Sequence, residues 1–115
     1  MTVMIYYNPK CGTCRKVRAA VEAKGLKPEL IEYLKNPPSV PELDAVCRKL
    51  GLEPQAIARG KEPLYEKIAA QKLNRAGWLQ ALHDNPVLIE RPIVMAGDRA
   101  VIARPPEKLE AVFTR

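Results

Sequence analysis

The spacing of apolar residues predicts a strand, a helix and a second strand in the first third of the chain. Residues 2–7 are β-branched or aromatic except for Met4, and they end at an Asn-Pro pair, as a short buried strand does. From Cys11 the apolar positions take helical spacing until Gly25, and ELIEYL after Pro28 predicts the second strand. Together they form a βαβ unit with parallel strands.

The middle of the chain is helical in pattern. Ser39 or Pro41 begins a helix that runs to Leu50 and is closed by Gly51. Further short helical stretches are expected at 54–59, 63–70 and 74–84. Because this block, 39–85, is too short and too broken for a core of its own, we expect a helical insertion within a single domain, 1–115.

The pattern returns to strands near the C-terminus. Pro92 to Met95 and Arg99 to Ala103 flank a Gly-Asp pair, which predicts a β-hairpin. Pro105-Pro106 then begins a last helix, with Leu109, Val112 and Phe113 on one face. The whole pattern predicts an α/β fold, β-α-β followed by helices and then β-β-α.

Composition and charge narrow the functional classes. No apolar run approaches the ~20 residues that cross a bilayer, and the N-terminus lacks the signal-peptide pattern, so we expect a cytoplasmic protein without a membrane segment. The net charge of +6 favours an anionic partner. Aromatic residues make up only 5% and no run of five like charges occurs, which argues against a nucleic-acid surface.

The cysteines fit neither a disulfide framework nor a zinc site. Their number, 3, is odd, and one C-x-x-C stands without the second pair that zinc requires, so no metal is expected. Cys47 has helical spacing with Leu43 and Leu50 and is expected to be a buried apolar side chain. His83, the one histidine, falls in a helical stretch and is expected to be exposed.

Cys11 and Cys14 stand where a strand passes into a helix, the context of a thioredoxin-like redox motif. Unpaired N–H groups and the dipole at a helix N-terminus favour thiolate over thiol. Lowering a thiol pKa by two units takes about 2.7 kcal/mol, and a helix N-terminus supplies at most ~2 kcal/mol. We therefore expect a nearby cation, and Lys10 and Arg15 flank the site in sequence.

With these motifs the chain resembles the ArsC/Spx family of thioredoxin-fold proteins, and most closely its glutaredoxin-dependent arsenate reductases. The resemblance spans essentially the whole chain. It rests on IYYNPKCGTCR at 5–15, NPPS at 36–39, RGKEPLY at 59–65, NPVLIERPIV at 85–94 and ARPPE at 103–107.

The resemblance implies roles for six residues. Cys11 would be the catalytic nucleophile, and Arg59, Arg91 and Arg104 would bind the oxyanion, for which a planar guanidinium is well matched. Pro92 falls where thioredoxin folds carry a cis-proline. The implied reaction is reduction of arsenate to arsenite, without a bound cofactor or metal and by a monomer. Electrons would come from glutathione with glutaredoxin, or from thioredoxin through Cys14 as the resolving cysteine.

Two departures keep alternatives open. Family reductases often carry histidine where this chain has Tyr7, and many carry serine where it has Cys14. A C-x-x-C resembles Spx-type regulators, which bind RNA polymerase and use the pair as a redox switch. The chain is therefore an arsenate reductase, a regulator of that type, or a reductase of another oxyanion or of protein disulfides. Arg59, Arg104 and the RPPE segment favour an oxyanion enzyme.

Overall fold

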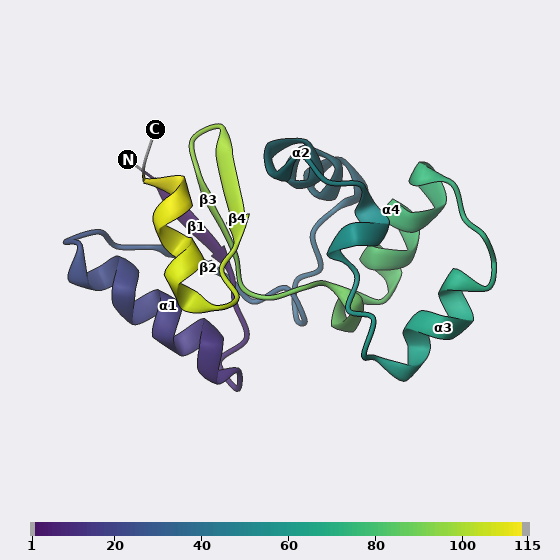
Figure 1. Cartoon of the computed structure of the whole chain (residues 1–115), viewed down its shortest axis with the longest axis horizontal. Helices are drawn as coiled ribbons and strands as arrows, with labels where there is room; N and C mark the ends of the chain where they lie inside the picture. The colour runs from purple at the N-terminus through teal and green to yellow at the C-terminus, as the bar shows by residue number, and fades with distance from the viewer. Residues whose placement is uncertain (1, 114–115) are drawn as a thin grey trace. The chain divides into compact units, whose positions relative to one another are not determined.

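A computed structural model describes residues 2–113, and the ends of the expected 1–115 domain lie outside this range. The chain divides into two compact units (Figure 1). The first comprises the residues up to Asn36 and those from Arg91 onward, and the second is Pro37–Glu90. The second unit contains the expected helical block. That block's status as an insertion within one domain stays a prediction.

The first unit is built on a four-stranded mixed sheet with the order β2-β1-β3-β4. β1 (Val3–Tyr6) is central, because it pairs with β2 (Glu29–Ile31) in parallel and with β3 (Ile93–Ala96) antiparallel. β4 (Arg99–Ile102) completes the hairpin. Gly97 has a φ of +63°, which a two-residue hairpin turn requires at its first position.

One face of this sheet carries the core of the first unit. Side chains alternate along a strand, so Val3, Ile5 and Tyr7 share a face, and they pack with Cys14 and other buried residues of α1. α1 (Gly12–Ala23) and the C-terminal 3₁₀ helix η3 (Pro106–Val112) lie beside each other against that face (Figure 1). The predicted β-α-β then β-β-α order is confirmed.

β2 is shorter than the sequence predicts. ELIEYL was expected to form a strand as a whole, but only Glu29–Ile31 is paired. The N–H of Tyr7 donates to the Ile31 carbonyl at 2.8 Å, and β1 has no further residue to offer because Asn8 and Pro9 follow. Beyond this point the chain turns, with the N–H groups of Lys35 and Asn36 donating to the Glu32 carbonyl.

The second unit is helical. It consists of α2 (Val40–Leu50), η1 (Pro54–Ile57), α3 (Pro63–Ala69), α4 (Arg75–Asp84) and η2 (Pro86–Leu88). α2 begins at a capping box, in which Ser39 Oγ accepts from the Glu42 N–H and the Glu42 carboxylate accepts from the Ser39 N–H. It ends at Gly51, whose φ is +70°. The expected helix bounds hold to within a residue or two.

Replacing Gly51 by alanine should lower the free energy of unfolding by about 1 kcal/mol, because a Cβ is strained in the left-handed region. Gly60→Ala is the matched control. Gly60 does not have a positive φ and has open space around it, so its replacement should be neutral or slightly stabilising. Urea unfolding followed by circular dichroism measures both variants. Equal stabilities for the two would contradict the helix end described above.

Candidate active site

Cys11 is the N-cap of α1, at the point where the chain leaves the central strand. Its backbone is extended, with φ −92° and ψ 120°, and its sulfur accepts a hydrogen bond from the Cys14 N–H at 3.4 Å. The Cys11 N–H donates to the Asn8 carbonyl at 2.9 Å, which fixes the loop before the helix. The side chain is almost fully buried. The sulfur therefore lies at the positive end of α1 with restricted access to water.

Two arginines from the far end of the chain meet this sulfur. Arg104 Nη2 lies 3.6 Å from Cys11 Sγ, and Arg104 Nε donates to the Arg91 carbonyl at 3.1 Å. The Arg91 guanidinium also contacts the Cys11 sulfur. Arg91 lies two residues before β3 and Arg104 two residues after β4, so the pairing of Ile93 with Ile102 brings the two arginines together. The bonds Arg91–Pro92 and Arg104–Pro105 are both cis; the first was expected and the second was not.

These contacts lower the pKa of Cys11. Burial opposes ionisation, but the Cys14 N–H, the Cys14 thiol and the Arg91 guanidinium outweigh it, and the pKa falls from its ordinary value to about 7. A much larger fraction of Cys11 is then thiolate at pH 7 than for a thiol of ordinary pKa. Arg91 is thus the cation that we expected near the Cys11 thiolate. Arg15, one of the two expected candidates, instead donates to the Pro9 carbonyl at 2.8 Å.

The other two cysteines are held as thiols. Burial, above all, raises the pKa of Cys14 to about 12, with the Asn8 backbone opposing it and the neighbouring Cys11 sulfur adding to it. Cys14 is a hydrogen-bond donor to Cys11 in this state, and the two are not joined in a disulfide. Cys47 is fully buried in the second unit, as expected, and burial raises its pKa to about 11.

Arg59 and His83 belong to the second unit. Arg59 forms an ion pair with Glu62 at 2.8 Å, and both side chains are partly buried. Its predicted role in oxyanion binding stays a prediction. The expectation that His83 is exposed was wrong. The ring is partly buried, and its Nδ1 lies 2.8 Å from the Pro38 carbonyl, because the start of α2 packs against the end of α4.

Two tyrosines contact arginines in ways the sequence did not indicate, and Tyr33 does so at the site. Tyr33 is fully buried and interacts with the Arg91 guanidinium; burial lowers the pKa of Arg91, but its contacts with Cys11 and Tyr33 raise it overall. Tyr7 lies under Arg18, whose guanidinium carbon is 5.7 Å from the ring centroid. Nothing in the sequence indicated that Tyr33 lies at the site, because its position predicted only a strand residue.

One buried donor at the site lacks an acceptor. Arg91 Nε is inaccessible to solvent and has no hydrogen-bond partner within residues 2–113. A buried N–H without an acceptor is costly. In the same part of the chain, no group of three His, Cys, Asp or Glu residues is arranged to hold a metal ion.

Comparison with known proteins agrees with this geometry. The sequence model of the ArsC family matches residues 6–112. The chain belongs to the ArsC family. It is 40% identical to "Arsenate reductase" of Haemophilus influenzae over 110 residues, covering 93% of this chain and 95% of that protein. It is 36% identical to "Arsenate reductase" of Neisseria meningitidis serogroup A over 114 residues, covering 96% and 97%.

Solved structures of the family share the fold. "Arsenate reductase from Vibrio cholerae" superimposes with a TM-score of 0.92 at 40% identity, covering 97% of this chain and 98% of that one. The thioredoxin-like α/β fold expected from the sequence is therefore confirmed. Residues 2–113 contain no helix that meets the length and hydropathy needed to span a membrane.

The pKa of Cys11 predicts how its alkylation depends on pH. The rate of reaction with iodoacetamide should rise through a midpoint near pH 7 in the wild type. Arg91→Met removes a cation that stabilises the thiolate, so the midpoint should move up by about one unit and the rate at pH 7 should fall. Lys16→Met, an exposed cation on α1, is the control and should leave the midpoint in place. An unchanged midpoint in Arg91→Met would contradict the assigned role of Arg91.

Proposed function

We propose that this ArsC-family chain reduces arsenate to arsenite at Cys11. The observation that carries the proposal is the convergence of one low-pKa sulfur and two guanidinium groups, Arg91 and Arg104. A thiolate and an anionic substrate repel each other, and the two cations offset that repulsion where the new bond forms. Their planar donors also match the oxygen geometry of a tetrahedral oxyanion.

The proposed reaction has two steps. The Cys11 thiolate attacks arsenic, an As–O bond breaks, and the leaving oxygen departs as water after protonation. An external thiolate then attacks the Cys11 sulfur. A sulfur–sulfur bond forms, and arsenic leaves with the electron pair of the S–As bond as arsenite. Two electrons pass from two thiols to As(V), and the product on the protein is a mixed disulfide with the donor.

The protonation of Cys14 bears on the source of the second thiol. A thiol with a pKa of about 12 is almost wholly un-ionised at neutral pH and is a weak nucleophile. Its contact with Cys11 suits a hydrogen-bond donor that stabilises the reactive thiolate. We therefore favour an external donor, glutathione with glutaredoxin, over internal recycling through Cys14 and thioredoxin.

The alternatives make different demands on the site. A regulator of the Spx type requires a surface that fits polymerase, but it does not require two guanidinium groups at the sulfur. A reductase of another oxyanion would use the same arginines, because phosphate and sulfate present similar oxygens. The names of the similar proteins favour arsenate within that class.

Arg104→Lys tests the oxyanion site in a glutathione- and glutaredoxin-coupled arsenate assay. Lysine keeps the charge but lacks the planar pair of donors of the guanidinium group. The value of kcat/KM for arsenate should therefore fall roughly 30-fold, a loss of about 2 kcal/mol of transition-state stabilisation. Cys11→Ser should show no turnover and sets the background, and Arg48→Lys, an exposed pair with Asp44 in the second unit, should behave as wild type. Equal activity of Arg104→Lys and Arg48→Lys would contradict the proposal.

A further inference from the structure

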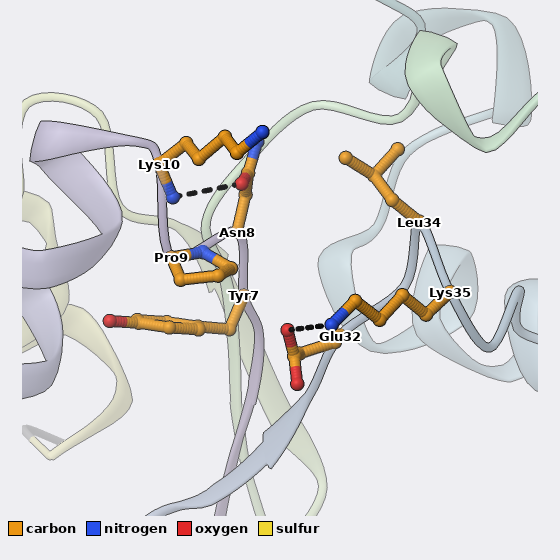
Figure 2. A pocket seen from close by; sticks show the side chains of 7 residues that line it. All are labelled: Tyr7, Asn8, Pro9, Lys10, Glu32, Leu34 and Lys35. Carbon is orange, nitrogen blue, oxygen red and sulfur yellow. Dashed lines mark hydrogen bonds and ion pairs between the residues drawn. The ribbon is translucent and has the colours of Figure 1, made fainter.

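A pocket of about 240 Å³ opens beside the loop that leads to Cys11 (Figure 2). One wall is the loop 7–10, and the other is formed by Glu32, Leu34 and Lys35, where the chain turns after β2. Most of the exposed lining is carbon, and the volume lies just below the ~300 Å³ at which small-molecule sites begin. Nothing in the reaction described so far uses this pocket.

The sheet order places the pocket and the arginines on opposite sides of the Cys11 loop. β1 leads into this loop, with β2 on one side of it and β3 and β4 on the other. Arg91 and Arg104 belong to the β3–β4 side, and the pocket is walled by the continuation of β2. Neither arginine lines the pocket, so an oxyanion held by them would leave the pocket itself open to a second reactant.

The rim of the pocket is charged and its interior has an exposed apolar side chain. Leu34 is 42% exposed. Figure 2 shows Leu34 and the Lys10 side chain extending toward each other across the opening, while Lys35 reaches back to Glu32. The Lys35–Glu32 pair is loose, at 3.6 Å with both ends exposed. No carboxylate of residues 2–113 lies within ion-pair distance of the Lys10 ammonium.

We propose that this pocket binds the electron donor as a small anionic thiol peptide. Two lysines and one carboxylate complement a peptide with two carboxylates and one ammonium group, which is the charge pattern of glutathione. Lys10 and Lys35 bind the carboxylates, Glu32 binds the ammonium group, and Leu34 and Pro9 contact the aliphatic part. The inference rests on the proposed function, since a donor pocket serves an adduct on Cys11 that an external thiol must reduce.

The pocket raises the rate of one defined step. The peptide thiolate attacks the Cys11 sulfur, forms a sulfur–sulfur bond and displaces the group attached there, which leaves with the electron pair of the broken bond. Binding the peptide beside Cys11 makes this encounter effectively intramolecular. The same gain applies to any leaving group on Cys11, so the pocket can be tested without arsenate.

The test uses the full chain with Cys14→Ser, so that no internal thiol competes, and with Cys11 joined to 2-nitro-5-thiobenzoate. Release of the yellow thiolate is followed with glutathione and, separately, with 2-mercaptoethanol, which is neutral and has no carboxylate to bind. Lys10→Glu combined with Lys35→Glu reverses the two rim cations. Lys27→Glu combined with Lys108→Glu makes the same change of net charge at exposed positions outside the pocket.

The rim double variant should slow the reaction with glutathione about tenfold and change the reaction with 2-mercaptoethanol by less than twofold. The control pair should leave both rates within twofold of the parent. Equal slowing by the rim and control pairs would overturn the proposal, since the effect would then be the general field of the protein. Equal slowing of both thiols in the rim variant would overturn it too. A chain that passes this test but does not reduce arsenate would refute the proposed function alone.

Discussion

The structure depends on a balance at one atom, the Cys11 sulfur. Burial favours the neutral thiol, whereas the Cys14 N–H, the Cys14 thiol and Arg91 favour the anion, and the net result is a pKa of about 7. Had burial prevailed, Cys11 would resemble Cys14, which shares its surroundings and is held as a thiol. The pKa values of two cysteines three residues apart thus shift in opposite directions, because Cys11 accepts from the Cys14 N–H and contacts Arg91, whereas burial dominates at Cys14.

The fold supplies each part of that balance from a different stretch of chain. β1 and the Asn8 carbonyl hold Cys11 at the start of α1, and the β3–β4 hairpin brings Arg91 and Arg104 to the same end of the sheet. The Arg104 side chain donates to the backbone of Arg91, so the two are positioned together. Packing of Val17 and Val21 on the strands fixes the helix that activates the sulfur.

Local sequence signals predicted the local structure well. The Cys11 motif, the Ser39 cap and the Gly51 stop all depend on interactions within four residues, and each lies where the pattern put it. Features that depend on long-range contacts were harder to predict from the sequence. β2 ends early because its partner strand ends, His83 is partly buried because α2 packs on α4, and the cation at Cys11 is Arg91, which is distant in sequence. The family resemblance, and not the hydrophobic periodicity, predicted that Arg91 and Arg104 are site residues.

Protection of Cys11 by an oxyanion tests the central claim most directly, because it needs neither a donor nor turnover. Sulfate at the site should slow alkylation of the Cys11 thiolate by iodoacetamide, with half-protection near millimolar concentration, about 4 kcal/mol of binding. Sodium chloride at matched ionic strength controls for screening of the arginines. The account predicts protection by sulfate and little by chloride. Equal protection by the two salts, together with tight binding of RNA polymerase by the purified protein, would contradict it in favour of a regulator.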